Sequence, residues 1–164
     1  MEHGQPKDIK ITAGIITISD RSSRGERPDT SGPVIREILE SINAEIKEYR
    51  IIPDEKDIIA DTMKELSDIV HVDLIVSTGG TGLAPRDVTP EATLEVIDKR
   101  VPGIEEAMRA ESIKITPHGL LSRAVAGIRN KTLIINLPGS PKAVKENLSA
   151  ILSALPHAVE IMRG

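Results

Sequence analysis

The sequence contains no cysteine, tryptophan or phenylalanine, and Tyr49 is its single aromatic residue. The absence of cysteine excludes disulfides, thiolate metal sites and thiol nucleophiles. One aromatic side chain cannot provide the stacking surfaces that bind single-stranded nucleic acids. No apolar run approaches the roughly 20 residues that span a bilayer. We therefore expect a cytoplasmic protein with no nucleic-acid partner and no membrane partner.

The charge of the 164-residue chain is slightly negative, because 25 Asp and Glu outnumber 21 Lys and Arg to give a net charge of −4. Such a chain provides no overall attraction for polyanions. Its length fits one domain. We expect a single domain over residues 9–164, preceded by a flexible polar tail over residues 1–8.

Short β-branched runs alternate along the chain with longer stretches of helical periodicity. Strands are predicted over 9–19, 73–77 and 132–137, with an edge strand over 45–52. Helices are predicted over 33–43, 57–70, 90–100, 102–112 and, with a break at Pro156, 141–162. A tight turn at Asn130-Lys131 predicts a hairpin and hence one antiparallel strand. The pattern indicates an α/β fold, a three-layer αβα sandwich around a mostly parallel sheet.

Three small, hydroxyl-rich loops follow the strongest strands and lead toward helices. They are Ser19-Asp20-Arg21-Ser22-Ser23-Arg24-Gly25 continuing to Asp29-Thr30-Ser31-Gly32, Ser77-Thr78-Gly79-Gly80-Thr81-Gly82, and Leu137-Pro138-Gly139-Ser140-Pro141. In open α/β sheets ligands bind beyond the carboxyl ends of the strands. Glycine-rich loops before helices favour phosphate there, although any one of them also fits a simple tight turn.

Known nucleotide motifs do not account for these loops. The sequence lacks G-x-x-x-x-G-K-[ST], and the Gly80-Thr81-Gly82 stretch reaches Pro85 where a dinucleotide fingerprint requires Gly or Ala. No G-x-S-x-G element is present, and no two histidines have metal-ligand spacing. These absences argue against a P-loop NTPase, a Rossmann dehydrogenase, a triad hydrolase and a zinc site.

Two aspartates follow predicted strands on the same edge of the sheet, Asp54 in Pro-Asp-Glu and Asp87 in Pro-Arg-Asp-Val-Thr-Pro. Asp54 also fits a helix N-cap, and Asp87 also fits a turn former. Their functional interpretation is a pair of oxygen ligands for Mg²⁺ bound to substrate phosphates. Local cations for a polyanionic substrate lie in or beside the loops: Arg21, Arg24, Arg27, Arg86, Arg123 and Lys142.

The ordered combination of these motifs resembles the MogA/MoaB family of molybdenum cofactor biosynthesis, which includes the G domain of gephyrin and its plant counterpart. The matching elements are Ser19-Asp20-Arg21 with Gly25, Asp29, Ser31 and Gly32, then Thr78-Gly79-Gly80-Thr81-Gly82, Arg86-Asp87-Val88-Thr89-Pro90-Glu91, Ser122-Arg123-Ala124 and Leu137-Pro138-Gly139-Ser140-Pro141. The resemblance implies a molybdopterin-binding domain, assembled as a homotrimer.

The resemblance also implies an activity, that of a molybdopterin adenylyltransferase. Such an enzyme transfers AMP from Mg-ATP to the molybdopterin phosphate, releases pyrophosphate and passes its product to a separate metal-insertion protein. The implied catalytic and Mg²⁺-binding residues are Asp54 and Asp87. The implied substrate-binding residues are Ser19, Asp20, Gly79, Gly80, Thr81, Gly82, Pro138, Gly139 and Ser140. A non-catalytic MoaB-type molybdopterin carrier or scaffold, and a nucleotide- or phosphate-binding regulator, remain as alternatives.

Overall fold

The computed structural model describes residues 9–164, so the tail predicted over residues 1–8 lies outside the described residues. A six-stranded sheet with the order β2-β1-β3-β6-β5-β4 forms the centre of the fold. Its strands are β1 (Ile11–Ile18), β2 (Ala44–Ile52), β3 (Leu74–Thr78), β4 (Lys99–Arg100), β5 (Ala126–Arg129) and β6 (Thr132–Leu137). Strands β2, β1, β3 and β6 are parallel, and β5 is antiparallel to both of its neighbours. The predicted mostly parallel sheet and its hairpin are confirmed.

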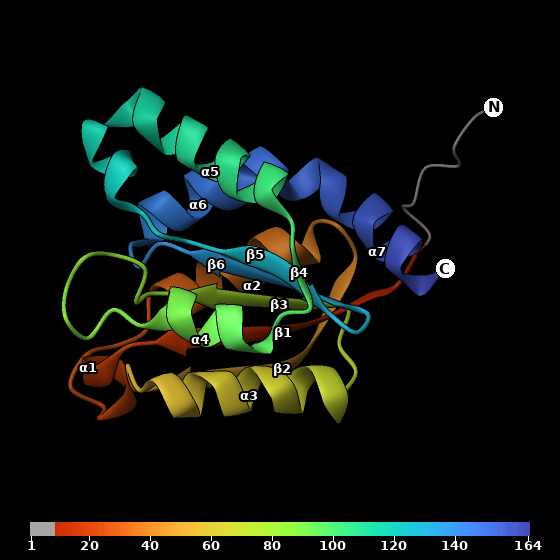
Figure 1. Ribbon diagram of the computed structural model, residues 1–164, viewed down its shortest axis with the longest axis horizontal. Coiled ribbons are helices and arrows are strands. Elements are labelled where there is room, and N and C mark those ends of the chain that lie inside the picture. The colour runs from red at the N-terminus through yellow and green to blue at the C-terminus, as the bar shows by residue number, and fades with distance from the viewer. Residues whose placement is uncertain (1–8) are drawn as a thin grey trace.

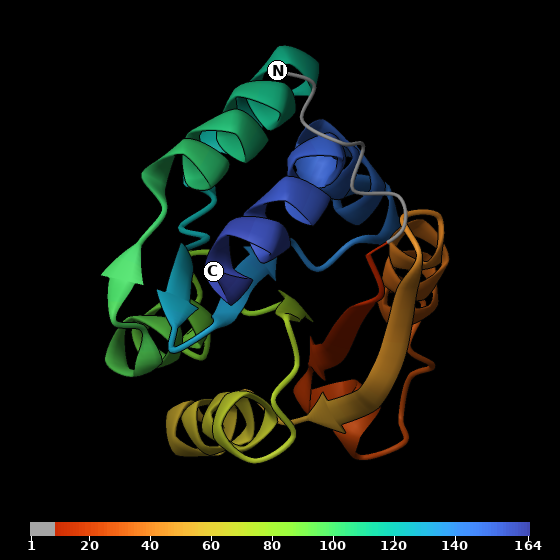
Figure 2. The same ribbon diagram turned by 90° about the vertical axis from the view of Figure 1, so that its right-hand side faces the viewer.

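Helices cover both faces of the sheet. They are α1 (Asp20–Ser23), α2 (Ser31–Glu40), α3 (Lys56–Asp68), α4 (Thr89–Val96), α5 (Pro102–Ile115), α6 (Pro141–Ile151) and α7 (Leu155–Arg163), with short 3-10 helices η2 (Pro117–Leu121) and η3 (Leu152–Ala154). Helices α3 and α4 lie below the sheet in Figure 1, and α5, α6 and α7 lie above it. Figure 2 shows the same layers from the side and confirms the three-layer sandwich.

The two faces of the sheet build two apolar cores, because successive side chains of a strand point to opposite sides. Ile15 of β1 packs in one core with Leu39 of α2 and Leu148 of α6. The next residue, Ile16, packs in the other core with Met63 of α3. Each fully buried aliphatic side chain contributes roughly 1.5–3 kcal/mol. Because side chains pack against both faces of these strands, the positions from which the loops at the strand ends begin are fixed.

Two predicted helix boundaries are wrong. The helix predicted over 90–100 ends at Val96, and residues 99–100 form β4 because the Asp98 and Val101 amides donate to carbonyls of β5 at 2.7 and 2.8 Å. The break predicted at Pro156 lies instead at η3. Pro156 occupies the first turn of α7, where a missing N–H costs no helical hydrogen bond. Among the described residues, no helix combines the length and apolarity that crossing a membrane requires.

Tyr49 lies on β2, which is an edge strand as predicted, and packs against α2. A Cβ atom on Gly32 would lie 2.0 Å from the Tyr49 hydroxyl oxygen, so glycine permits this close approach without a shift of the tyrosine side chain. The Arg36 guanidinium of the same helix lies over the Tyr49 ring, 5.9 Å from its centre. The single aromatic ring therefore contacts the first turn of α2, directly after the loop that follows β1.

Candidate active site

The loops after β1, β2, β3 and β6 enclose a cavity of about 500 Å³ at the carboxyl ends of the parallel strands. These loops lie on the left of Figure 1, where the loop after β3 extends furthest from the sheet. The cavity, called the cleft below, is lined by Thr17, Ile18, Ser19, Ser22, Arg27, Pro28, Asp29, Thr30, Ser31, Asp54, Thr78, Gly79, Gly80, Asp87, Gly139, Ser140 and Pro141. All three predicted loops and both predicted aspartates therefore reach one cavity.

The predicted substrate-binding residues divide between two cavities. The cleft receives Ser19, Gly79, Gly80, Gly139 and Ser140. A second cavity of about 260 Å³ is lined by adjacent residues of the same loops, namely Thr81, Gly82 and Pro138. Asp20 lines neither of these two cavities and instead contacts Asp54 and Arg86.

Gly79 and Gly80 form the floor of the cleft in a conformation that other residues rarely adopt, with φ angles of +97° and +69°. A Cβ on Gly79 would lie 2.3 Å from the Ile18 carbonyl oxygen. Thr89, at the start of α4, donates its hydroxyl to the Gly79 carbonyl at 3.0 Å and its amide to the Gly80 carbonyl at 3.1 Å. The backbone bend after β3 is therefore held between the Ile18 carbonyl and the hydrogen bonds from Thr89.

The loop after β6 is tied to its neighbours by hydroxyl groups. Thr78 donates to the Pro138 carbonyl and Ser31 donates to the Gly139 carbonyl, both at 2.6 Å. Ser140 is the N-cap of α6 and accepts from the Ala143 amide at 3.2 Å. The amino end of α6, with its partial positive charge, therefore opens beside the cleft.

Asp54 and Asp20 exchange hydrogen bonds across the ends of β2 and β1. The Asp20 amide donates to the Asp54 carboxylate at 2.9 Å, and the Asp54 amide donates to the Asp20 carboxylate at 3.0 Å. The N-cap position of α3 is occupied by Glu55. The N-cap interpretation of Asp54 is therefore wrong, and its carboxylate is held toward the cleft by the neighbouring loop.

Arg86 joins three loops at the rim of the cleft. It forms two bonds to the Asp20 carboxylate, at 2.7 and 3.1 Å, and one to the Glu55 carboxylate at 2.8 Å. These bonds lower the pKa of Asp20 and raise the pKa of Arg86. Asp20 is therefore held ionised beside Asp54.

The pKa of Asp54 shifts in the opposite direction to that of Asp20. Burial raises the pKa of its carboxyl group, and the negative charges of Asp20 and Asp87 raise it further. In the described chain neither Asp54 nor Asp87 forms an ion pair. A cation bound between them would relieve this repulsion.

Asp87 closes a turn and also faces the cleft. Its carboxylate accepts from the Ala84 amide at 3.0 Å, and its own amide donates to the Ala84 carbonyl at 2.9 Å. The turn-forming interpretation is confirmed. Because Asp87 also lines the cleft, one oxygen bond leaves the carboxylate able to accept a ligand as well.

Three of the six predicted cations are paired with carboxylates of the protein itself. Arg24 pairs with Glu26, and Arg123 pairs with Glu91 at 2.6 Å. Among the described residues that line the cleft, Arg27 is the one cation, and it forms no ion pair within the described chain. Its exposed side chain is therefore available to an anionic ligand.

Sequence reasoning did not assign a role to Thr17 or Asp29, which also line the cleft. The Asp29 carboxylate accepts from the Thr17 hydroxyl at 2.7 Å and from the Ser31 and Gly32 amides at 3.1 Å. The available signal was an Asp two residues before a helix start, which is typical of a capping residue. Thr17 carried no signal, because it lies within a continuously apolar strand.

Known proteins share both the sequence and the fold. Residues 14–157 match the family model described as a probable molybdopterin binding domain. A molybdopterin adenylyltransferase of Helicobacter pylori is 46% identical over 156 residues, which cover 94% of this chain and 89% of that protein. Gephyrin of Dictyostelium discoideum is 44% identical over 169 residues, which cover 96% of this chain and 23% of gephyrin.

Solved structures give the same result. The crystal structure of the molybdopterin biosynthesis enzyme MoaB of Thermus thermophilus superposes with a TM-score of 0.88 and 49% identity, covering 93% of this chain and 96% of that one. These matches, together with the convergence of the motif loops on one cleft, confirm the resemblance seen in the sequence. The chain belongs to the molybdopterin-binding MogA/MoaB family of molybdenum cofactor biosynthesis.

Proposed function

We propose that this protein is a molybdopterin adenylyltransferase, an enzyme that transfers AMP from ATP to the terminal phosphate of molybdopterin and releases pyrophosphate. The observation that carries the proposal is the placement of Asp54 and Asp87 in one cleft with the three phosphate-type loops. The 46% identity to an H. pylori protein of that name supports it.

In this reaction the substrate provides the nucleophile. An oxygen of the molybdopterin phosphate attacks the α-phosphorus of ATP, a new P–O bond forms, and the bond to the bridging oxygen of pyrophosphate breaks. Nucleotidyl transfer of this kind requires positioning and charge stabilisation from the protein. The Gly79 amide donates to the Leu137 carbonyl at 3.1 Å, so the donors to phosphate oxygens would be the amides that follow it in the loop and the amino end of α6. Arg27 supplies a cation to the same cleft.

The donor set fits one divalent cation. Asp54 and Asp87 face the same cavity and form no ion pair with an arginine in the described chain, and burial, with the nearby charges of Asp20 and Asp87, raises the pKa of Asp54. Residues 9–164 hold no group of three or more His, Asp or Glu side chains suited to a metal. Two carboxylates plus substrate phosphates are the usual ligands of Mg²⁺. When bound, Mg²⁺ would neutralise charge on the reacting phosphates.

The assembly and the following step are also proposals, supported by membership of the family. We propose that the protein is a homotrimer and that its adenylylated product passes to a separate metal-insertion protein. Light scattering is expected to give three times the 17.7 kDa chain mass. A monomer mass would contradict the trimer. The cytoplasmic location stays a prediction.

The test of the activity is direct. The protein is incubated with molybdopterin, Mg²⁺ and ATP, and the mixture is assayed for pyrophosphate and for a pterin that carries AMP. Both products are expected in equal amounts. Saturable pterin binding with neither product would refute the proposal and indicate a carrier. Tight ATP binding with no pterin affinity would indicate a nucleotide-binding regulator.

A further inference from the structure

Arg123 lies between η2 and β5, and its side chain joins the two ends of the loop tip after β3. Its Nε donates to the Gly82 carbonyl at 2.8 Å, and its Nη2 donates to the Asp87 carbonyl at 2.7 Å. The four residues between these two carbonyls, 83–86, are exposed. One guanidinium group therefore closes the neck of a loop that otherwise extends into solvent.

The orientation of the Arg123 side chain is itself fixed. Its Nη1 donates to the Glu91 carboxylate at 2.6 Å, and this contact lowers the pKa of Glu91. Its own amide donates to the Thr81 carbonyl at 2.9 Å. Three side-chain bonds along a planar fork hold the guanidinium in one position, which the compact ammonium group of lysine does not reproduce.

The backbone around Arg123 is anchored to the core of the protein. Arg109 of α5 donates to the Ser122 carbonyl at 3.2 Å and to the Ala124 carbonyl at 3.0 Å. Arg109 in turn lies 3.5 Å from Glu105, whose side chain is 3% exposed. A continuous series of contacts thus runs from buried Glu105 to the loop that carries Asp87.

We propose that Arg123 is a positioning residue for the adenylyl transfer, which fixes the backbone of Asp87 so that the Asp87 carboxylate faces the cleft. Arg123 is not among the residues that line the cleft, so it acts on the reaction through the loop that it holds, and Asp87 is the residue of that loop tip that lines the cleft. Within the tip, the Ala84–Asp87 turn is local, and the Arg86 side chain bonds to neighbouring loops, whereas Arg123 ties the backbone at both ends of the tip to a distant segment. This inference rests on the proposed function.

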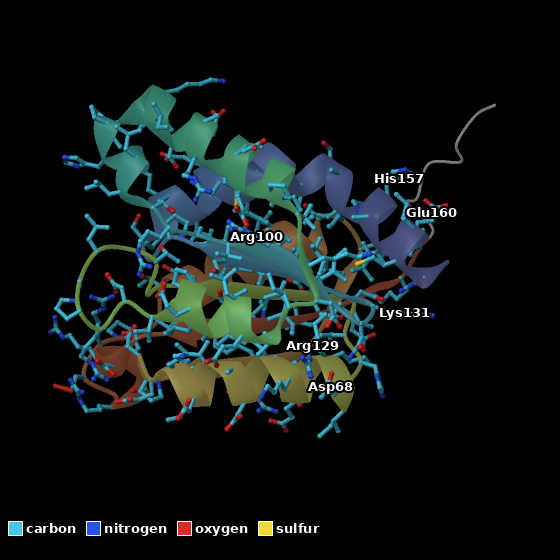
Figure 3. The ribbon with its side chains drawn as sticks, viewed as in Figure 1. Asp68, Arg100, Arg129, Lys131, His157 and Glu160 are labelled. Atoms are coloured by element: carbon cyan, nitrogen blue, oxygen red, sulfur yellow. The ribbon has the colours of Figure 1, made fainter. Side chains whose placement is uncertain are left out.

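The test compares Arg123→Lys with the matched control Arg129→Lys. Arg129 also makes three side-chain bonds, two to the Asp68 carboxylate at 3.1 and 2.8 Å and one to the Val96 carbonyl at 2.8 Å. It lies with Asp68 near the end of α3 that is far from the cleft (Figure 3). Both variants lose comparable bonds, but only one of them loosens the loop of Asp87.

For Arg123→Lys we expect faster hydrogen exchange of the amides over 82–88 and a kcat about 100-fold lower, since misplacement by about 1 Å costs that much. The KM values for ATP and molybdopterin should change by less than about threefold, because ground-state contacts in the cleft remain. Arg129→Lys should keep the kcat and the exchange of residues 82–88. If Arg123→Lys does not fold, Glu91→Gln is the second variant. It removes the charge that orients the Arg123 guanidinium while leaving Arg123 in place, and it should lower kcat about 10-fold.

Equal kcat values in the two lysine variants, or unchanged exchange over 82–88 in Arg123→Lys, would overturn the proposal. A rise in KM with unchanged kcat would also overturn it, because that result would mean uniform loss of binding. If the wild-type protein forms no AMP-pterin product, the proposed function fails separately. The difference in hydrogen exchange between the two variants still decides whether Arg123 holds the loop.

Discussion

Aspartates lie at both edges of the parallel sheet, but the pKa of Asp54 at the cleft edge and the pKa of Asp68 at the far edge shift in opposite directions. At the edge away from the cleft, Asp68 pairs with Arg129 and Asp73 pairs with Arg163, at 2.8 and 2.7 Å. The contact with Arg129 lowers the pKa of Asp68. At the cleft edge, burial and neighbouring carboxylates raise the pKa of Asp54. The two aspartates at the far edge are paired with arginines, whereas Asp54 at the cleft edge has no arginine partner within the described residues.

The largest expected difference between the edges is in activity. Asp87→Asn should lower kcat about 1,000-fold, equivalent to about 4 kcal/mol of transition-state stabilisation, because it removes one of the two carboxylates proposed to hold the Mg²⁺ that neutralises the reacting phosphates. Molybdopterin affinity should fall much less. Asp68→Asn, at the opposite edge, should leave both unchanged. Turnover assays with pterin-binding titrations check this, and equal losses of turnover and binding would make Asp87 a structural residue only.

The second difference concerns backbone strain in the cleft. Gly79→Ala should destabilise the protein by about 2–4 kcal/mol, because its left-handed backbone and a clash combine. The new Cβ would lie 2.3 Å from the Ile18 carbonyl. Gly25→Ala is the control, with a φ of +73° and no atom within 4 Å of the new Cβ, so it should cost only about 1 kcal/mol. Urea denaturation measures both, and equal losses would show that Ile18 moves aside.

The smallest expected difference is in melting temperature, and its sign is opposite for aspartates at the two edges. At pH 7, Asp54→Asn should raise the melting temperature by about 1–2 °C, and Asp68→Asn should lower it by a similar amount. The raised pKa of Asp54 means that its ionisation costs stability as pH rises through the unfolded-state value. The lowered pKa of Asp68 means that its stabilisation exists above the unfolded-state value and is lost as pH falls through the folded one.

Calorimetry over pH 2–7 tests both signs. The two variants should approach the wild-type melting temperature in acid, where both carboxyl groups are protonated in the folded and unfolded states. Two shifts of the same sign at pH 7 would contradict the electrostatic contrast between the edges.

The layers of the fold were predictable because strands and helices have different hydrophobic periods. The run from residue 9 to residue 19 predicted β1, and the Asn130-Lys131 turn predicted the hairpin. The two-residue strand β4 was not predictable, since Lys99 and Arg100 are polar and form a strand only through pairing with β5.

The cleft was predictable at the level of loops and less so at the level of side chains. Strand ends placed Asp54 and Asp87 on one edge, and both line the cavity. The sequence did not reveal that Asp20 contacts Asp54 and Arg86 rather than the cavity, or that Arg123 bonds carbonyls about 40 residues away in sequence. Such bonds depend on three-dimensional neighbours that periodicity does not encode.

Tyr49 gives the protein an internal optical reporter. Its hydroxyl adjoins Gly32, one residue after a residue that lines the cleft, and no tryptophan is present to mask its emission. Any ligand that shifts the start of α2 should therefore change tyrosine fluorescence. Pyrophosphate, which does not absorb in the near ultraviolet, would allow occupancy of the cleft to be followed without a label.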